Sequence, residues 1–347
     1  MVFRMRAGYA IFFLALAVRL AYLARLIRSP LFDSPSMDAA IHDDWAYAIA
    51  GRGGSVSDAA FFRAPLYPYL LSLFYLLSDR SMGLYVAMRI FQFLAGALGC
   101  VLIYRLGERT FGRTAGILAG LMAALYWPFI YNEGELLLDS LLWVLIVGAF
   151  LMLPEEPTPS PSSPKGGREF LAGILLGLAA ITRPNVLMFV PVAAWWVFRG
   201  GTKSRALSLI LGVVLCVLPV TARNWVVGND FVLVASQAGV NFYIGNNEWS
   251  DGKTAVVPGT RATWWGGYED TIRIAEQAQG RPLAPSEVSR FWMGKGMEFL
   301  VQKPARAMRH YLLKLKYLLN PTEISNNQNV YFLRNYAGIL SWPVFLG

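Results

Sequence analysis

Charged residues are scarce in this chain of 347 residues. Asp, Glu, Lys and Arg together make up 15% of it, whereas hydrophobic residues make up 55%. Soluble domains carry roughly a quarter charged residues, so the composition argues against a soluble protein and favours one embedded in a lipid bilayer. A helix needs about 20 mostly apolar residues to cross the hydrocarbon layer. The sequence is therefore expected to contain several runs of that length.

Cysteine and histidine are almost absent. Cys100 and Cys216 are the only cysteines, and each lies in an apolar run, so no disulfide framework is expected. His42 and His310 lie far apart, and no HExxH or CxxC pattern occurs, which argues against a zinc site. P-loop, G-x-S-x-G and helix-opening G-x-G-x-x-G patterns are also missing. Their absence argues against nucleotide-dependent transport and serine hydrolysis.

Apolar runs occur along most of the first 220 residues. They cover residues 9–27, 82–106, 114–131, 136–153, 170–182, 186–198 and 206–220. The polar break between the fifth and sixth runs contains Pro184, and proline disfavours helix in the residue before it. The pattern predicts an all-α polytopic membrane protein in which two short helices meet at this break.

The net charge is +9, but no basic run alternates with aromatic residues, so no nucleic-acid partner is expected. The cations lie between apolar runs and act as topology signals. With the N-terminus in the cytoplasm, the cytoplasmic junctions hold Arg4, Arg6, Arg105, Arg109, Arg113, Lys165, Arg168, Arg199, Lys203 and Arg205. The opposite side receives Asp33, Asp38, Asp43, Asp44, Asp58, Glu133, Glu135 and Asp139. This distribution follows the positive-inside rule and predicts acidic extracytoplasmic loops.

Four regions are expected on this basis. Residues 1–222 form the transmembrane region, with a first outer loop at 29–81, and the Pro/Ser-rich residues 154–168 form a cytoplasmic linker. Residues 223–304 are polar and form an extracytoplasmic loop domain. Residues 305–347 contain a helix that alternates cations with apolar residues, as a helix lying in the headgroup region does, followed by the start of another span. We expect the polypeptide to be truncated within that last run.

The first outer loop contains a candidate general base. If residues 36–54 are helical, Asp38, His42 and Trp45 share one face, because their spacings of four and three match the helical repeat, and Asp43 and Asp44 point elsewhere. A carboxylate within hydrogen-bond reach of an acceptor hydroxyl can remove its proton. The alternative is an ordinary solvated acidic helix.

A series of segments in fixed order resembles one family of enzymes. The series consists of the acidic loop with Asp38, then "FFRAPLYPYLL", "RIFQFLAGALG", "ALYWPFIYNEGELLLD", "LLGLAAITRPN", "PVTARNW" and "GVNFYIGNN". Together they resemble the bacterial family 39 type of glycosyltransferases, which are relatives of protein O-mannosyltransferases and aminoarabinose transferases and have the helical fold called GT-C.

The resemblance implies a bacterial cytoplasmic (inner) membrane enzyme with its active site on the extracytoplasmic face. It implies a sugar donor linked to a polyprenyl phosphate, inversion at the anomeric carbon, and a catalytic aspartate in the first outer loop. Asp38 matches best by its position before Trp45. Asp43 and Asp44 remain alternatives, because the tyrosine that often follows the family's aspartate is absent here.

Three arginines are candidates to hold the donor phosphate, whose leaving oxygen gains negative charge during transfer. Arg183 in "ITRPN" is the first, because an arginine at the end of a span is a functional suspect. Arg63 is the second and Arg19 a weaker third. The alternative for Arg183 is a side chain that snorkels to the headgroups.

Other polar residues are expected around the substrates. Glu133, Glu135, Asp139 and His42 are expected to position the acceptor or a divalent cation, and Mg²⁺ or Mn²⁺ stays open because carboxylates suit hard cations. Asn241, Asn246 and Asn247 form a candidate substrate loop, or else a simple turn.

The sequence thus predicts a membrane glycosyltransferase that uses a polyprenyl-phosphate sugar, with a glycan, lipid or protein as acceptor. The competing hypothesis is a non-catalytic membrane protein, either a flippase or transporter for lipids or an inactive truncated transferase.

Overall fold

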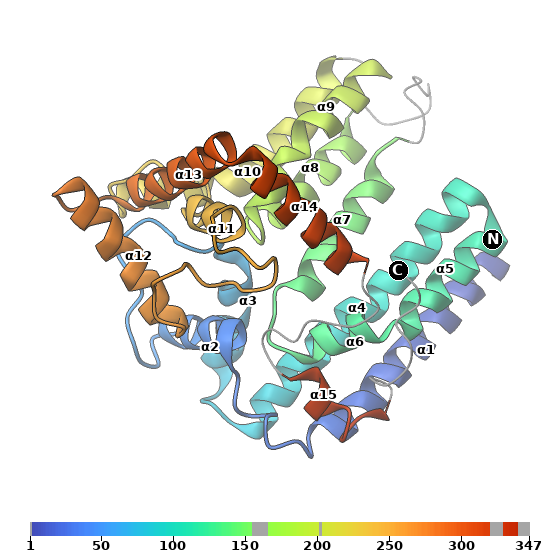
Figure 1. Cartoon of the computed structure of the whole chain (residues 1–347). Coiled ribbons are helices and arrows are strands. Elements are labelled where there is room, and N and C mark those ends of the chain that lie inside the picture. Colours follow the sequence, from blue (N-terminus) through green and yellow to red (C-terminus); the bar gives the residue numbers. More distant parts are fainter. Residues whose placement is uncertain (1, 155–165, 201–202, 320–328, 339–347) are drawn as a thin grey trace. The chain divides into compact units, whose positions relative to one another are not determined.

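The computed structural model describes residues 2–154, 166–200, 203–319 and 329–338, and every regular element in these ranges is a helix (Figure 1). The helices of the first two thirds are α1 (Val2–Leu26), α2 (Met37–Ile49), α3 (Leu66–Leu77), α4 (Met82–Phe111), α5 (Arg113–Leu125), α6 (Trp127–Gly134), α7 (Asp139–Met152), α8 (Gly167–Ala180), η1 (Pro184–Met188), α9 (Val190–Arg199) and α10 (Lys203–Val226). They are followed by α11 (Ala238–Gly245), α12 (Trp264–Gln279), α13 (Pro285–Gln302), α14 (Pro304–Leu318) and α15 (Val330–Leu333).

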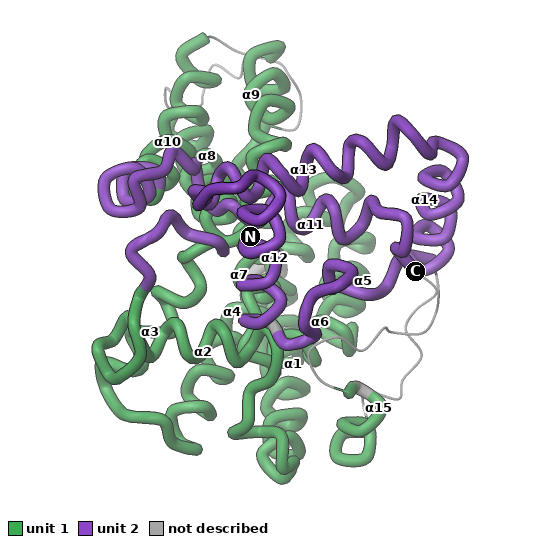
Figure 2. Tube along the Cα trace, turned by 60° about the vertical axis from the view of Figure 1, so that its left-hand side comes forward, with its two compact units in different colours: residues 1–56, 64–220, 329–342 green, residues 57–63, 221–328, 343–347 purple. Residues whose placement is uncertain are grey.

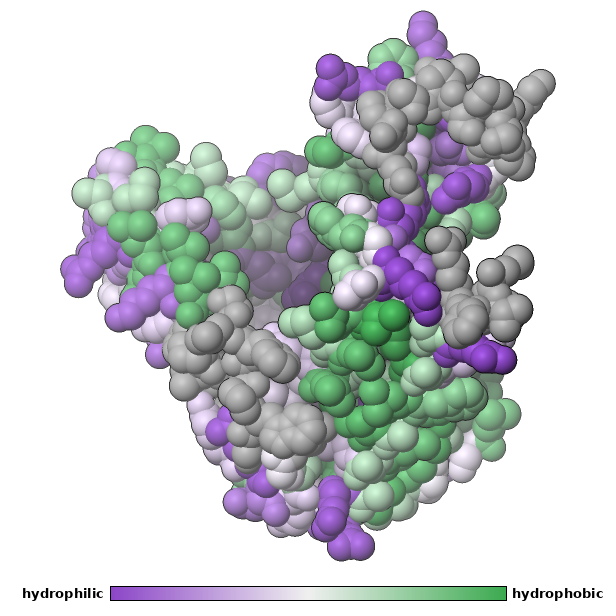
Figure 3. Space-filling view, turned by 90° about the vertical axis from the view of Figure 1, so that its right-hand side faces the viewer, coloured by the Kyte–Doolittle hydropathy of each residue, from purple (hydrophilic) through white to green (hydrophobic). Residues whose placement is uncertain are grey.

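Three described helices are long and apolar enough to cross a membrane, namely residues 6–26 of α1 and the whole of α4 and α10. The bent pair α5 and α6 adds a fourth if the two form one span. Figure 3 shows a broad hydrophobic patch on the side where α1 and α5 lie in Figure 1. The expected all-α polytopic membrane fold is thereby confirmed.

Two interruptions shape these helices. The expected break around Pro184 is present, because α8 ends at Ala180 and Arg183 is extended before η1 begins. The apolar run 114–131 is divided, because the chain bends by 46° between α5 and α6. Tyr126 is extended there, and Pro128 follows in the first turn of α6, where its missing N–H costs nothing.

The described chain divides into two compact units (Figure 2). The first comprises residues 1–56, 64–220 and 329–342, and the second comprises 57–63, 221–328 and 343–347. The second unit begins at Thr221, beside the boundary expected at residue 222, but it also includes residues 57–63 of the expected first outer loop. Residues 155–165 of the expected linker, and the final run beyond residue 338, lie outside the described residues.

Small residues allow close helix packing in the first unit. Ala15, Ala97 and Ala124 are fully buried where α1, α4 and α5 meet around Tyr104. Gly116 of α5 lies so close to α4 that a Cβ atom there would come within 2.5 Å of the Glu108 nitrogen. Helices in membranes associate through such close contacts, because lipid offers no hydrophobic driving force between them.

The second unit has its own core and polar anchors. Val240, Val288 and Trp292 are buried between α11, α12 and α13. The buried Asn224 side chain accepts a hydrogen bond from the Phe61 N–H (2.9 Å) and donates to the carbonyls of Val232 and Val234, which fixes residues 57–63 in this unit.

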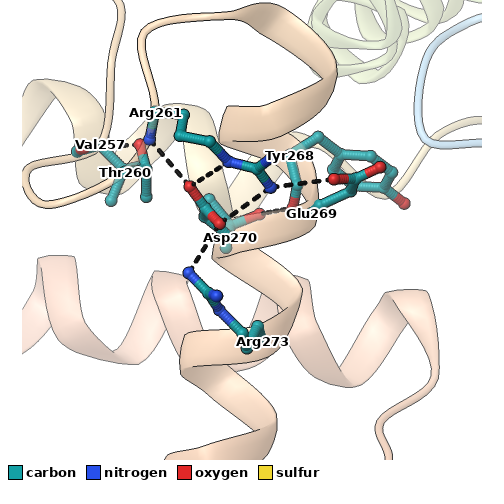
Figure 4. A network of polar contacts seen from close by, with 8 residues as sticks. Val257, Thr260, Arg261, Tyr268, Glu269, Asp270 and Arg273 are labelled. Carbon is teal, nitrogen blue, oxygen red and sulfur yellow. Dashed lines mark hydrogen bonds and ion pairs between the residues drawn. The ribbon is translucent and has the colours of Figure 1, made fainter.

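A carboxylate fixes the loop that precedes α12. Asp270 is 2% exposed and accepts hydrogen bonds from the Arg261 backbone and side chain and from Arg273 (Figure 4). Hydrogen bonds from Arg261 lower the pKa of Asp270, so this carboxylate stays ionised at neutral pH.

Candidate active site

Asp38 lies in the first turn of α2, where the helix dipole favours a negative charge. The helix forms as the sequence predicts, and Asp38 is half-buried while Asp44 is exposed. His42 is buried, its Nδ1 lies 3.1 Å from the Leu136 carbonyl oxygen, and its ring meets Tyr67 edge to face. The segment of α2 that carries Asp38 is therefore held by the α6–α7 connection and by α3.

Asp43 faces a different set of partners. It is 3% exposed and accepts hydrogen bonds from the hydroxyls of Tyr75 and Tyr85, while Arg80 lies 3.0 Å away. Burial raises the pKa of Asp43 and these partners oppose the rise. Asp44 pairs with the same Arg80 at 2.5 Å. Asp43 thus joins α2 to α3 and α4, and Asp44 pairs with the loop between α3 and α4. A catalytic role for either stays a prediction.

Asp139 and Arg183 form an accessible ion pair. Asp139 is the first residue of α7, and Arg183 lies in the break between α8 and η1. The Oδ1 atom of Asp139 is 3.3 Å from Nη1 of Arg183. Their side chains are 42% and 51% exposed, so a ligand can reach both. Asp38 lies near enough for its charge to act on Asp139. Three separate elements therefore bring together two carboxylates and a guanidinium, which we call the Asp38–Asp139–Arg183 site.

The other candidate acids are buried. Glu133 accepts two hydrogen bonds from Arg19, at 2.5 Å to Nε and 2.9 Å to Nη2, and neither side chain has any exposed surface. Arg19 also donates to the carbonyls of Ala15 and Ala124. A Cβ atom on Gly96 would collide with the Glu133 carboxylate, so glycine at this position makes room for the pair. Glu133 and Arg19 thus join α1, α4, α5 and α6, and their expected ligand roles stay predictions.

A buried polar layer lies behind His42. Gln92 accepts a hydrogen bond from the Tyr67 hydroxyl and donates to the carbonyls of Glu133 (2.7 Å) and Glu135 (2.6 Å). Arg89 donates to the carbonyls of Gly134 and Phe32. These side chains fix the connection between α6 and α7, and hence the place where Asp139 begins its helix.

Glu135 lies in that connection, outside the candidate spans, and is 2% exposed. Burial raises the pKa of Glu135 to about 7, and the charge of Arg89 opposes the rise. Glu135 is therefore a carboxyl group that titrates near neutral pH.

The remaining candidates belong to the second unit. Arg63 is half-buried at the end of residues 57–63. Asn246 donates to the Phe242 carbonyl, and Asn247 donates to those of Tyr243 and Ile244, so both amides satisfy the last carbonyls of α11. Asn241 is exposed on α11. This geometry fits the turn alternative for Asn246 and Asn247, and a substrate role for the three stays a prediction.

Several residues of these networks were not anticipated. Arg89 interrupts an apolar run, which is a signal of function or of a buried partner, and it is 2% exposed. Gln92, Tyr67 and Arg80 carry no such signal, because their partners are carbonyls and side chains distant in the sequence. Within the described residues, no group of three or more His, Cys, Asp or Glu side chains is placed to hold a metal ion.

Residues 62–226 match the family model described as dolichyl-phosphate-mannose-protein mannosyltransferase. The matched segment is just under half of the chain and includes Asp139 and Arg183 but not Asp38. No curated protein and no solved structure gives a significant match. Over this segment the chain is thus similar to membrane glycosyltransferases of the GT-C superfamily.

The buried ion pair leads to a stability prediction. Replacing Arg19 with leucine leaves the Glu133 charge unpaired in the helix bundle, which costs roughly 3–5 kcal/mol. The double variant Arg19→Leu/Glu133→Leu removes both charges, and we expect it to be more stable than the single variant. Thermal unfolding in detergent measures the stability of the single and the double variant. A double variant less stable than Arg19→Leu would contradict the assigned pairing.

Glu135 leads to a pH prediction. Its pKa is higher in the folded protein than the ordinary 4.5, so the folded state binds this proton more tightly than the unfolded state. The resulting stabilisation is complete below pH 4.5 and is lost as the pH rises to about 7. Over this pH interval we expect the free energy of unfolding of the wild type to fall by about 3 kcal/mol relative to that of Glu135→Gln. Parallel unfolding profiles of the two proteins would contradict this expectation.

Proposed function

We propose that the chain transfers a sugar from a polyprenyl-phosphate donor to an extracytoplasmic glycan, lipid or protein, with inversion at the anomeric carbon. The bacterial cytoplasmic membrane is the proposed location, with the active site on its outer face. The observation that carries the proposal is the Asp38–Asp139–Arg183 site, which combines a candidate base with an accessible cation. The family match over residues 62–226 supports the reaction class.

The proposed reaction needs one base and one stabilised leaving group. Asp38 accepts the proton of the acceptor hydroxyl, and the hydroxyl oxygen forms a bond to the anomeric carbon from the face opposite the phosphate. The bond between that carbon and the phosphate oxygen breaks, and the oxygen leaves with the electron pair as polyprenyl phosphate. General base catalysis of this kind contributes typically 10²- to 10⁴-fold to the rate.

Arg183 is the proposed partner of the departing phosphate. Its Nη1 already contacts a carboxylate oxygen of Asp139 at 3.3 Å, so the site holds a guanidinium in a defined position before any ligand arrives. A guanidinium matches phosphate geometry with two parallel donors. Asp139 orients Arg183 in this proposal.

A divalent cation, Mg²⁺ or Mn²⁺, fits the same chemistry. Asp38 and Asp139 supply two carboxylates whose charges interact, and hard cations accept carboxylate and phosphate oxygens together. When bound, the cation would neutralise part of the phosphate charge. The transfer step proposed above does not depend on it.

The direct test compares Asp38→Asn with the wild type in proteoliposomes that contain radiolabelled polyprenyl-phosphate sugars. Asparagine keeps the shape of the side chain but cannot accept the proton. We expect sugar transfer to fall 10²- to 10⁴-fold, while Asp33→Asn, a change at an exposed aspartate of the same loop, retains activity.

Sugar transfer by Asp38→Asn at the wild-type rate would overturn the proposed role of Asp38. If Asp43→Asn or Asp44→Asn lost sugar transfer instead, the role of base would pass to the residue replaced. Absence of transfer from every donor by the wild type would favour the non-catalytic alternative.

A further inference from the structure

Helix α14 has an apolar stripe that no described part of the protein covers. Met308, Leu312 and Leu315 are 58%, 56% and 41% exposed, although they follow one another at helical spacings of four and three. Tyr311, Leu318 and Leu319 extend the same stripe and are 62%, 78% and 65% exposed. A helix in a soluble domain turns such a stripe toward its core, whereas α14 buries none of its residues.

Two cations lie along one edge of this stripe. Arg309 and Lys316 are both exposed and are seven residues apart, so they occupy the same side of the helix, three residues before and four residues after Leu312 of the stripe. Long basic side chains beside an apolar stripe reach the headgroups while the stripe enters the acyl chains.

The opposite face of α14 is used inside the second unit. Lys314 donates to the carbonyl of Gly245, and Arg306 binds the Glu248 carboxylate, which Lys303 just before the helix also binds at 2.7 Å. Lys253 lies over the ring of Tyr317, 4.2 Å from its centre. The inner face of α14 therefore holds residues 245–253, which comprise the last residue of α11 and the segment after it.

We propose that α14 docks on an anionic bilayer surface through its apolar stripe, and that it holds residues 245–253 at that surface. The apolar stripe matches the acyl region, and Arg309 and Lys316 match anionic headgroups, each contributing electrostatic attraction near the surface. The chain also contains helices long and apolar enough to cross a membrane, so a bilayer surface is present wherever the protein is inserted. The inference concerns membrane attachment and is independent of the reaction that the enzyme catalyses.

The test places single spin labels on the full chain in lipid nanodiscs. The labels occupy two matched pairs of neighbouring positions, Met308→Cys with Arg309→Cys, and Leu315→Cys with Lys316→Cys, in a Cys100→Ala/Cys216→Ala background. Accessibility to oxygen, which dissolves in the acyl region, is compared with accessibility to a water-soluble nickel complex. We expect labels at 308 and 315 to favour oxygen, and labels at 309 and 316 to favour nickel.

Lipid charge provides the second measurement. With phosphatidylglycerol in place of part of the phosphatidylcholine, the label at 315 is expected to move deeper, and this change should shrink in an Arg309→Gln/Lys316→Gln variant. The proposal fails if labels at 308 and 315 react with nickel as readily as those at 309 and 316. It also fails if both reagents are excluded from 308 and 315, because a protein partner or a second copy then covers the stripe.

Discussion

A bilayer contains no water to solvate a buried charge, so each ionised side chain inside the helix bundle requires a partner within the protein. Arg19 and Glu133 meet this requirement with two hydrogen bonds and no exposed surface. Arg89 does so by donating to the carbonyls of Gly134 and Phe32, and the neutral Gln92 amide donates to the carbonyls of Glu133 and Glu135. These contacts fix where α6 ends and α7 begins, and thereby where Asp139 lies. The accessible site thus depends on a layer of buried charges and amides that does not itself need to touch a ligand.

The contrast between buried and exposed ion pairs separates structural groups from those that we propose to react. Glu133 and Arg19 are a closed pair, whereas Asp139 and Arg183 are a pair that solvent and ligands can reach. Asp38 adds a second negative charge close to the first. Like charges held together cost free energy unless a cation or a proton joins them, so sites of this kind are typical of functional centres. In the second unit, the charges of α14 are divided in the same way between an inner face that binds Glu248 and an outer edge that stays exposed.

Much of this organisation can be predicted from the sequence. Four of the seven apolar runs give the candidate spans, counting α5 and α6 as one. Pro184 gives the break before η1, and the alternation in residues 304–319 gives an amphipathic helix. The bend between α5 and α6 escapes prediction, because Pro128 is tolerated in a first helical turn and does not by itself mark a break. The pairing of Arg19 with Glu133 escapes as well, since 114 residues separate them and any of several acids had the right charge. Periodicity places a residue on a helix face, but only the packing of several helices decides that Asp43 is buried by Tyr75 and Tyr85 while Asp38 stays accessible.

The central claim is that the Asp38–Asp139–Arg183 site receives the phosphate of a lipid-linked sugar. The most direct measurement is the dissociation constant of a polyprenyl phosphate for the protein in nanodiscs, with Arg183→Gln compared with Arg199→Gln, an exposed arginine at the end of α9. A hydrogen bond to a charged group contributes about 1.5–3 kcal/mol, so the account predicts roughly 10- to 100-fold weaker binding for Arg183→Gln and no change for Arg199→Gln. Equal binding by both variants and the wild type would contradict it.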